Sequence, residues 1–267
     1  MRKARGAFGA FFGFNNHEHI IMKTLFGTKG NMTQAYIEGF RIPVTKVNLG
    51  PCTVIQIKNQ EKDGYWSVQL GLGEKKLKNT TKQLQGHFKK SKINPRYIKE
   101  VRVTEEPKFQ VGDIIKVSDI FNSGDVVFVT ANTKGKGFAS GIQKYNFRGG
   151  PKTHGQSDRH RAPGSIGQTT TPGRVYRGKR MAGRMGNIQV TIKNLHVVNV
   201  DPEKNEILIS GAIPGRVGSF MTIKKVKAGS LRDLEHEVVA QVVETEEPEK
   251  VETPEGTKEE VKNEGQN

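Results

Sequence analysis

The chain has 267 residues, of which 34% are hydrophobic, and it carries a formal net charge of +16. Such an excess of Lys and Arg is typical of nucleic-acid binders rather than of enzymes that act on small acids. The single cysteine, Cys52, excludes an internal disulfide and a thiolate cluster for zinc. No stretch approaches the ~18 apolar residues of a membrane-spanning helix, so we expect a soluble chain without a membrane partner.

We expect both ends of the chain to be unstructured extensions. Residues 1–21 join three cations to four Phe without the pattern of a signal peptide or a presequence, so the folded part should open at Met22. Residues 233–267 hold 12 Asp or Glu against 3 Lys, a net charge of −9 that leaves +25 on the rest of the chain. Residues 232–267 should therefore form a disordered acidic tail, to which the apolar patch at 238–243 adds at most one strand.

Period-two alternation of apolar side chains predicts short β-strands before residue 134 and after residue 187. In the first part the expected strands are residues 42–47, 54–57, 66–70, 97–103, 114–117 and 126–130. In the second part they are residues 188–192, 195–200 and, after a turn at 201–205, residues 207–209. A polar, weakly helical insertion is expected around residues 75–100.

Strands on both sides of one long insertion indicate a mainly β fold. Because closure removes the exposed edges of many short strands, we expect residues 22–133 and 188–231 to form the two parts of a closed antiparallel barrel. The side chains expected to hold this barrel together include Trp66, Val68, Ile188, Val190 and Ile207.

The intervening segment, residues 134–187, carries 12 Lys or Arg and 12 Gly against a single acid, Asp158. It has little apolar surface to bury, and each Gly raises the entropic cost of ordering, so it cannot form a core of its own. Gly allows the main chain to lie against a sugar-phosphate backbone, which Lys and Arg neutralise. The segment therefore predicts an extended loop that is ordered by RNA.

Within this loop we predict that the cations, two His and the small polar residues near its middle contact RNA. The candidates are Lys134, Lys136, Lys144, Arg148, Lys152, His154, Arg159, His160, Arg161, Gly164, Ser165, Gly167, Gln168, Thr169, Thr170, Arg174, Arg177, Lys179, Arg180 and Arg184. The aromatic side chains among them should either stack on bases or pack the loop against the barrel; they are Phe138, Tyr145, Phe147 and Tyr176.

Three patterns in the loop approach enzyme motifs without completing them. Residues 173–180 spell a phosphate loop until the position of the magnesium-binding Ser or Thr, where Arg180 stands instead. Residues 164–167 resemble a nucleophile elbow, but Pro163 occupies the place of its first Gly. His154 and His160 flank Asp158 among cations, which favours RNA contact over acid-base chemistry. We therefore expect no enzyme activity, cofactor, metal or small-molecule substrate.

The chain also contains a series of ordered blocks: KGKGFA at 134–139, YNFR at 145–148, THG at 153–155, HRAPGSIG at 160–167, TPGRV at 171–175, GKRMAG at 178–183 and MGN at 185–187. Earlier blocks are GTKGNMT at 27–33, IPVT at 42–45, DGY at 63–65 and GHF at 86–88. From Met22 to about Lys227 the chain resembles the bacterial form of ribosomal protein three of the large subunit.

That resemblance implies a Greek-key barrel like that of translation factors, with a small α+β insertion. It implies that the loop runs through 23S rRNA toward the peptidyl transferase centre, with its tip at residues 164–172. It also implies early binding near the 3′ domain of that rRNA, contact with large-subunit proteins fourteen and nineteen, and a place in cytoplasmic ribosomes, with organellar ribosomes as a minor alternative. Some members carry a methylated Gln at the position of Thr170, so this modification should be missing here.

Two other classes of function remain open from the residues alone. A general DNA or single-strand binder shares the basicity, but it more naturally shows a recognition helix or a regular array of stacking aromatics. A nucleotide-dependent enzyme rests on the incomplete phosphate loop at residues 173–180.

Overall fold

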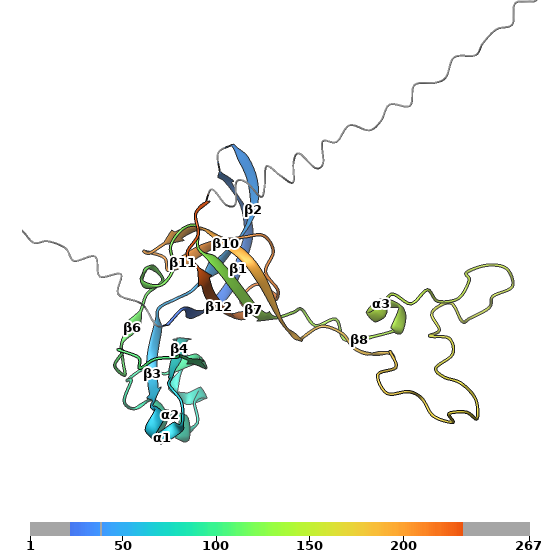
Figure 1. The fold of residues 1–267 in the computed structure, drawn as a ribbon, viewed down its shortest axis with the longest axis horizontal. Coiled ribbons are helices and arrows are strands. Elements are labelled where there is room, and N and C mark those ends of the chain that lie inside the picture. Colours follow the sequence, from blue (N-terminus) through green and yellow to red (C-terminus); the bar gives the residue numbers. More distant parts are fainter. Residues whose placement is uncertain (1–21, 38, 232–267) are drawn as a thin grey trace, which may run out of the picture.

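The computed structural model describes residues 22–37 and 39–231 and consists mainly of antiparallel β-strands (Figure 1). Six strands close into a barrel, four more form a separate sheet to one side, and a long loop leaves the barrel on the other side. The mainly β class is confirmed. The expected N-terminal extension and acidic tail, with the patch at 238–243, lie outside the described residues.

The barrel strands, in their order around the ring, are β1 (Thr24–Ile37), β12 (Phe220–Lys227), β7 (Val126–Asn132), β10 (Gln189–Asp201), β11 (Glu206–Ser210) and β2 (Phe40–Asn48). Every neighbouring pair is antiparallel, including β1 with β2, which closes the ring. Buried side chains recur at every second position in β7 (Val127, Val129, Ala131), β11 (Ile207, Ile209) and β12 (Met221, Ile223). Period-two alternation therefore fills the barrel interior.

Strand β2 departs from strict alternation in its middle. Val44 and Thr45 are adjacent and both fully buried, so the strand changes the face that it buries. Val47 reaches the main core, whereas Ile42 and Val44 pack with Val198 in a small second cluster. The β1–β2 hairpin thus has an apolar support of its own where it extends past the barrel (Figure 1).

The second sheet has the order β5 (Pro95–Arg102), β4 (Ser67–Glu74), β3 (Cys52–Lys58), β6 (Ile114–Ile115). Short helical segments accompany it: α1 (Gln60–Asp63), η1 (Leu77–Asn79), α2 (Lys82–Phe88) and η2 (Val117–Asp119). Val54, Val68 and Leu70 of this sheet join Leu25 and Val129 of the barrel in one cluster. Sheet and barrel therefore share a continuous core.

This arrangement corrects part of the barrel expected from the sequence. The strands at 54–57, 66–70, 97–103 and 114–117 belong to the separate sheet, because a half-buried strand alternates in the same way whichever sheet receives it. Trp66 precedes β4 and is half-buried. Ile188, expected in the core, is 61% exposed because it stands outside the barrel, just before β10 begins.

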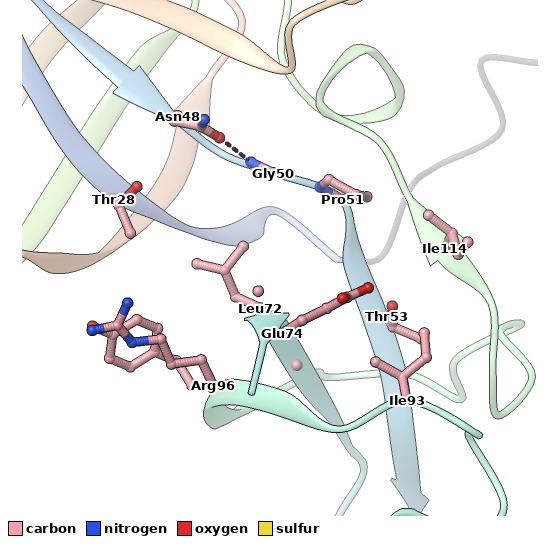
Figure 2. A pocket seen from close by; sticks show the side chains of 13 residues that line it. Thr28, Asn48, Gly50, Pro51, Thr53, Leu72, Glu74, Ile93, Arg96 and Ile114 are labelled. Atoms are coloured by element: carbon pink, nitrogen blue, oxygen red, sulfur yellow. Dashed lines mark hydrogen bonds between the residues drawn. The ribbon is translucent and has the colours of Figure 1, made fainter. Parts of the chain in front are cut away.

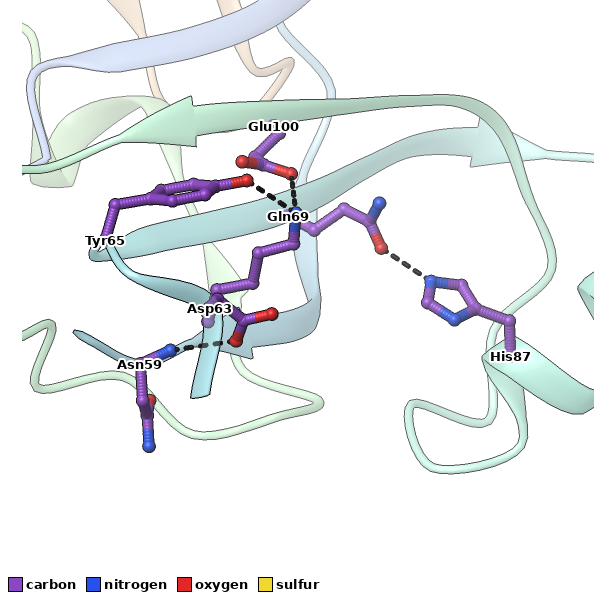
Figure 3. Close-up of polar contacts among 7 residues, drawn as sticks. Asn59, Asp63, Tyr65, Gln69, His87 and Glu100 are labelled. Carbon is purple, nitrogen blue, oxygen red and sulfur yellow. Dashed lines mark hydrogen bonds and ion pairs between the residues drawn. The ribbon is translucent and has the colours of Figure 1, made fainter. Parts of the chain in front are cut away.

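Polar contacts connect the helical insertion and the outer sheet (Figure 3). The Lys58 ammonium donates to the Tyr65 hydroxyl at 2.7 Å and pairs with Glu100 at 2.7 Å, which lowers the pKa of Glu100 and raises that of Lys58. The His87 Nε2 atom of α2 lies 2.6 Å from the Gln69 side-chain oxygen of β4. Because these contacts are partially exposed, they orient the helical insertion on the sheet more than they add to the stability of the chain.

Candidate nucleic-acid interface

The basic loop is carried by a two-stranded stem that continues β7 and β10 beyond the barrel (Figure 1). The amide of Thr133 donates to the Ile188 carbonyl oxygen at 2.9 Å, and that of Lys136 donates to the Met185 oxygen at 2.9 Å. Farther out, β8 (Phe138–Ala139) pairs with β9 (Gly183–Arg184). Both ends of the loop therefore stay in a hydrogen-bonded ribbon that points away from the barrel.

Gly186 sets the path of this stem. Its φ angle is +73°, and a Cβ atom built there would lie 2.1 Å from the carbonyl oxygen of Lys134. No L side chain fits at that separation, since real Cβ atoms essentially never come within 3.0 Å of another heavy atom. The two strands of the stem therefore approach each other as closely as glycine allows.

A tight connection between β11 and β12 lies at the root of the stem. The Lys29 ammonium donates to the carbonyl oxygens of Ile213 and, at 3.1 Å, of Gly215. Burial, with a smaller contribution from the nearby charge of Lys134, lowers the pKa of Lys29. A Cβ atom on Gly215 would come within 3.0 Å of the Asn132 oxygen at the end of β7. The connection is thus held rigidly against the start of the loop.

Helix α3 (Gly141–Tyr145) begins the outer part of the loop and gathers aromatic rings and cations. The rings of Tyr145 and Phe147 have centroids 6.0 Å apart, and the guanidinium of Arg180 lies 5.6 Å from the Tyr145 centroid. Gly141 is buried against Phe147, whose nearest ring atom would be 3.0 Å from a Cβ atom there. Phe147 is therefore part of the loop's own packing.

Residues 149–161 form a compact lobe, closed by His160. The amide of Gly150 donates to the His160 carbonyl oxygen at 3.0 Å. The imidazole Nδ1 lies 2.9 Å from the Pro151 oxygen, and Nε2 lies 3.1 Å from the Ser157 oxygen. The ring of His160 thus contacts the backbone of the lobe itself. The cations beside it in the sequence had suggested contact with RNA instead.

The tip of the loop is open to solvent. Residues 163–171 are all exposed. The Ser165 hydroxyl donates to the Gly167 oxygen at 2.9 Å, and the Gly173 amide donates to the Thr169 oxygen at 3.2 Å. No strand precedes residues 173–180, which removes the structural context that a phosphate loop needs.

Of the 20 candidate residues, 18 are exposed, and Lys144 and His160 are half-buried. Among the described residues, none of the loop's 12 cations forms an ion pair with a carboxylate. Phe138 is 81% exposed and Tyr176 is 53% exposed, so the packing role considered for Phe138 does not hold. The loop presents charge and two aromatic rings outward.

Two cavities occur near these elements. One, of about 440 Å³, lies where the barrel meets the second sheet and is lined mainly by apolar groups, with Glu74 and Arg96 at its edge (Figure 2). The other, of about 530 Å³, lies within the loop next to the lobe. The described residues contain no group of three His, Cys, Asp or Glu placed to hold a metal ion. They also contain no helix long and apolar enough to cross a membrane.

The family model of ribosomal protein L3 matches residues 77–207. A large ribosomal subunit protein uL3 from Herpetosiphon aurantiacus is 49% identical over 210 residues, which cover 78% of this chain and 99% of the relative. The chain belongs to the ribosomal protein L3 family. Further L3 relatives include proteins of the same name from a Picosynechococcus species, 51% identical over 74% of this chain and 94% of the relative, and from Thermotoga maritima, 44% identical over 78% and 99%.

Membership of the L3 family confirms the resemblance found in the sequence blocks. The chain is therefore a structural constituent of the large ribosomal subunit that serves translation, and it is not an enzyme. The general nucleic-acid binder outside the ribosome and the nucleotide-dependent enzyme are both set aside by this result.

Proposed function

We propose that this chain binds 23S rRNA directly near its 3′ domain, nucleates early assembly of the large subunit, and extends residues 134–187 through the rRNA toward the peptidyl transferase centre. One observation carries the proposal: a stem anchored in the barrel presents 12 cations that lack carboxylate partners among the described residues. Unneutralised cations crowded on a thin loop repel one another, and phosphate groups relieve that repulsion.

The shape of the loop supports binding inside folded RNA rather than on a duplex surface. Its root is a two-stranded ribbon, its outer part opens into extended turns away from the barrel, and residues 163–171 near its tip are exposed. Such a loop can thread between RNA helices, where main-chain and cationic contacts go to the sugar-phosphate backbone. The 20 candidate residues named above are the proposed contacts.

The barrel, in contrast, is proposed to sit at the subunit surface. Its β1–β2 hairpin exposes Met32, Tyr36 and Phe40 at 52%, 66% and 39%, which suits a protein neighbour. Large-subunit proteins fourteen and nineteen are the proposed neighbours, and a Greek-key barrel of the translation-factor type is the proposed topology. The proposed location is the cytoplasmic ribosome, with an organellar ribosome as the less favoured alternative.

Chemical footprinting on purified 23S rRNA tests this function. Full-length chain at a moderate salt concentration should protect a compact set of nucleotides near the 3′ domain, and hydroxyl-radical cleavage directed from the tip should map near the peptidyl transferase centre. A variant with Arg174 and Arg177 changed to Gln should keep the first pattern and weaken the second. Protection scattered evenly over the rRNA would contradict the proposal.

A further inference from the structure

An open hollow of about 530 Å³ in the loop lies between the lobe and the segment that returns from the tip through Lys179. Its lining brings together three kinds of group: the cations Arg148, Arg159 and Lys179, the aromatic ring of Phe147, and the amide of Gln156. No Asp or Glu lines it. The volume falls within the range of about 300–1,000 Å³ that is typical of small-molecule sites.

The cavity is formed by the chain's own packing. A Cβ atom on Gly149 would lie 2.6 Å from the His160 oxygen, and one on Gly150 would lie 2.8 Å from the Arg159 oxygen. The close approach of the backbone at Gly149 and Gly150, together with the His160 ring, whose two nitrogens lie near the carbonyl oxygens of Pro151 and Ser157, holds the lobe in place. A binder that is shaped beforehand avoids part of the ordering cost at the moment of binding.

We propose that this cavity holds a single unstacked nucleotide of RNA, with its phosphate on Arg148, Arg159 and Lys179 and its base beside Phe147. The proposal rests on the proposed rRNA-binding function and adds to it the kind of RNA element that is recognised. Unpaired bases are read by aromatic stacking and by hydrogen bonds to their edges, and the Gln156 amide can both donate and accept. A base inside a duplex has both faces covered by its stacked neighbours and cannot lie against the Phe147 ring.

The lining groups also do not suit the triphosphate site of a nucleotide-dependent enzyme. A nucleoside triphosphate site needs oxygen ligands for magnesium, and the lining offers no carboxylate. The phosphates of a duplex backbone would be bound by a row of cations, and they would make no use of an aromatic ring and an amide in the same hollow. A nucleotide that leaves its stack satisfies all three kinds of group together.

A titration of the isotope-labelled full chain by NMR tests the site directly. The probes are the four nucleoside 5′-monophosphates and, as the reference, inorganic phosphate. We expect at least one monophosphate to shift the amides of Phe147, Gly149, Gly150 and Gln156 saturably, with an affinity at least about fivefold above that of phosphate, since stacking on an aromatic ring contributes this much or more. Equal affinities for phosphate and all four nucleotides would overturn the proposal.

Three variants sharpen the test. Ala162→Leu fills the cavity without changing charge, and Phe147→Leu keeps apolar volume but removes the ring; each should reduce the nucleotide preference toward that of phosphate. Ala182→Leu is the matched control, because Ala182 is an exposed loop residue that does not line the cavity and is not among the proposed RNA contacts. If Ala182→Leu lowered the preference as much as Ala162→Leu, the cavity would not be the site.

Binding to 23S rRNA distinguishes failure of this inference from failure of the proposed function. Wild-type chain should bind the rRNA, and Ala162→Leu should weaken that binding about fivefold or more while the control Ala182→Leu weakens it less. Tight wild-type binding that is unchanged by Ala162→Leu would refute the nucleotide site and leave rRNA binding intact. Absence of wild-type binding would refute the proposed function itself.

Discussion

Replacing residues 155–180 with a short Gly-Ser linker should leave the barrel folded. No residue of that segment is buried, and in the described part of the chain the sole buried apolar side chain of residues 134–187 is Ala139. The change roughly halves the loop, and halving a loop lowers its closure entropy cost by about 0.6 kcal/mol. We therefore expect the free energy of unfolding, measured by urea denaturation, to change by less than about 1 kcal/mol.

The same replacement should strongly affect RNA binding. It removes half of the loop's 12 cations, namely Arg159, Arg161, Arg174, Arg177, Lys179 and Arg180. If 6 to 10 phosphates are neutralised by the whole loop, its affinity should fall by about 10³ to 10⁵ between 50 and 200 mM salt. Loss of six contacts should reduce the slope of log affinity against log salt by about 4 to 5. Filter binding over a salt series measures both slopes.

Two outcomes would refute this reasoning. A loss of more than about 3 kcal/mol of stability would show that the loop belongs to the folded core, as truncation of buried side chains does. An unchanged salt slope would show that these six cations do not meet phosphate. The control is a chain of full length in which these six cations are changed to Gln. It should show the same reduced salt slope as the shortened chain, but ribosomal subunits that contain it should keep any function that depends only on the length of the loop.

Gly186→Ala should weaken rRNA binding about tenfold or more, since the added Cβ atom must displace the stem. Gly178 also has a positive φ angle, but a Cβ atom there meets no neighbouring atom, so Gly178→Ala should weaken binding less. Filter binding compares the two variants. Hydrogen bonding from Lys58 lowers the pKa of Glu100 below 4.5, so the pair stabilises the chain above that pH and loses its effect as the pH falls through the folded value. Glu100→Gln should accordingly lower the urea midpoint at neutral pH, and this difference from the wild type should shrink as the pH falls below 4.5. Burial raises the pKa of Cys52 to about 11, so a thiol reagent at pH 8 should modify it at the rate of unfolding, and rapid modification of the native chain would contradict its burial.

Alternation along the chain identified most of the strands, because a half-buried strand must alternate whatever its partner. It did not reveal β1, whose sequence TLFGTKGNMTQAYI mixes Gly and polar residues with apolar ones. Gly27 is required there by a close approach, since a Cβ atom would lie 2.7 Å from the Asn48 oxygen, and a bulge between Lys29 and Met32 interrupts the period. Tertiary contacts of this kind leave no periodic signal.

The extent of the loop was predictable from the sequence, but its internal contacts were not. Charge and glycine content mark residues 134–187, and their exposure agrees with that reading. The ring of His160 bonds carbonyl oxygens, including that of Pro151 nine residues earlier, and Phe147 packs near Gly141. Residue type alone cannot distinguish a side chain that contacts RNA from one that packs within the loop, because histidine and aromatic rings are suited to both kinds of contact.

The pairing of β7 with β10 makes the whole of residues 134–187 the connection of a single wide hairpin. Its two ends are brought together by the barrel and not by anything that the connection encounters. The barrel can therefore fold without any contact that the connection makes beyond it. Lengthening, trimming or rewriting the connection during evolution thus changes what the loop can reach and leaves the barrel untouched.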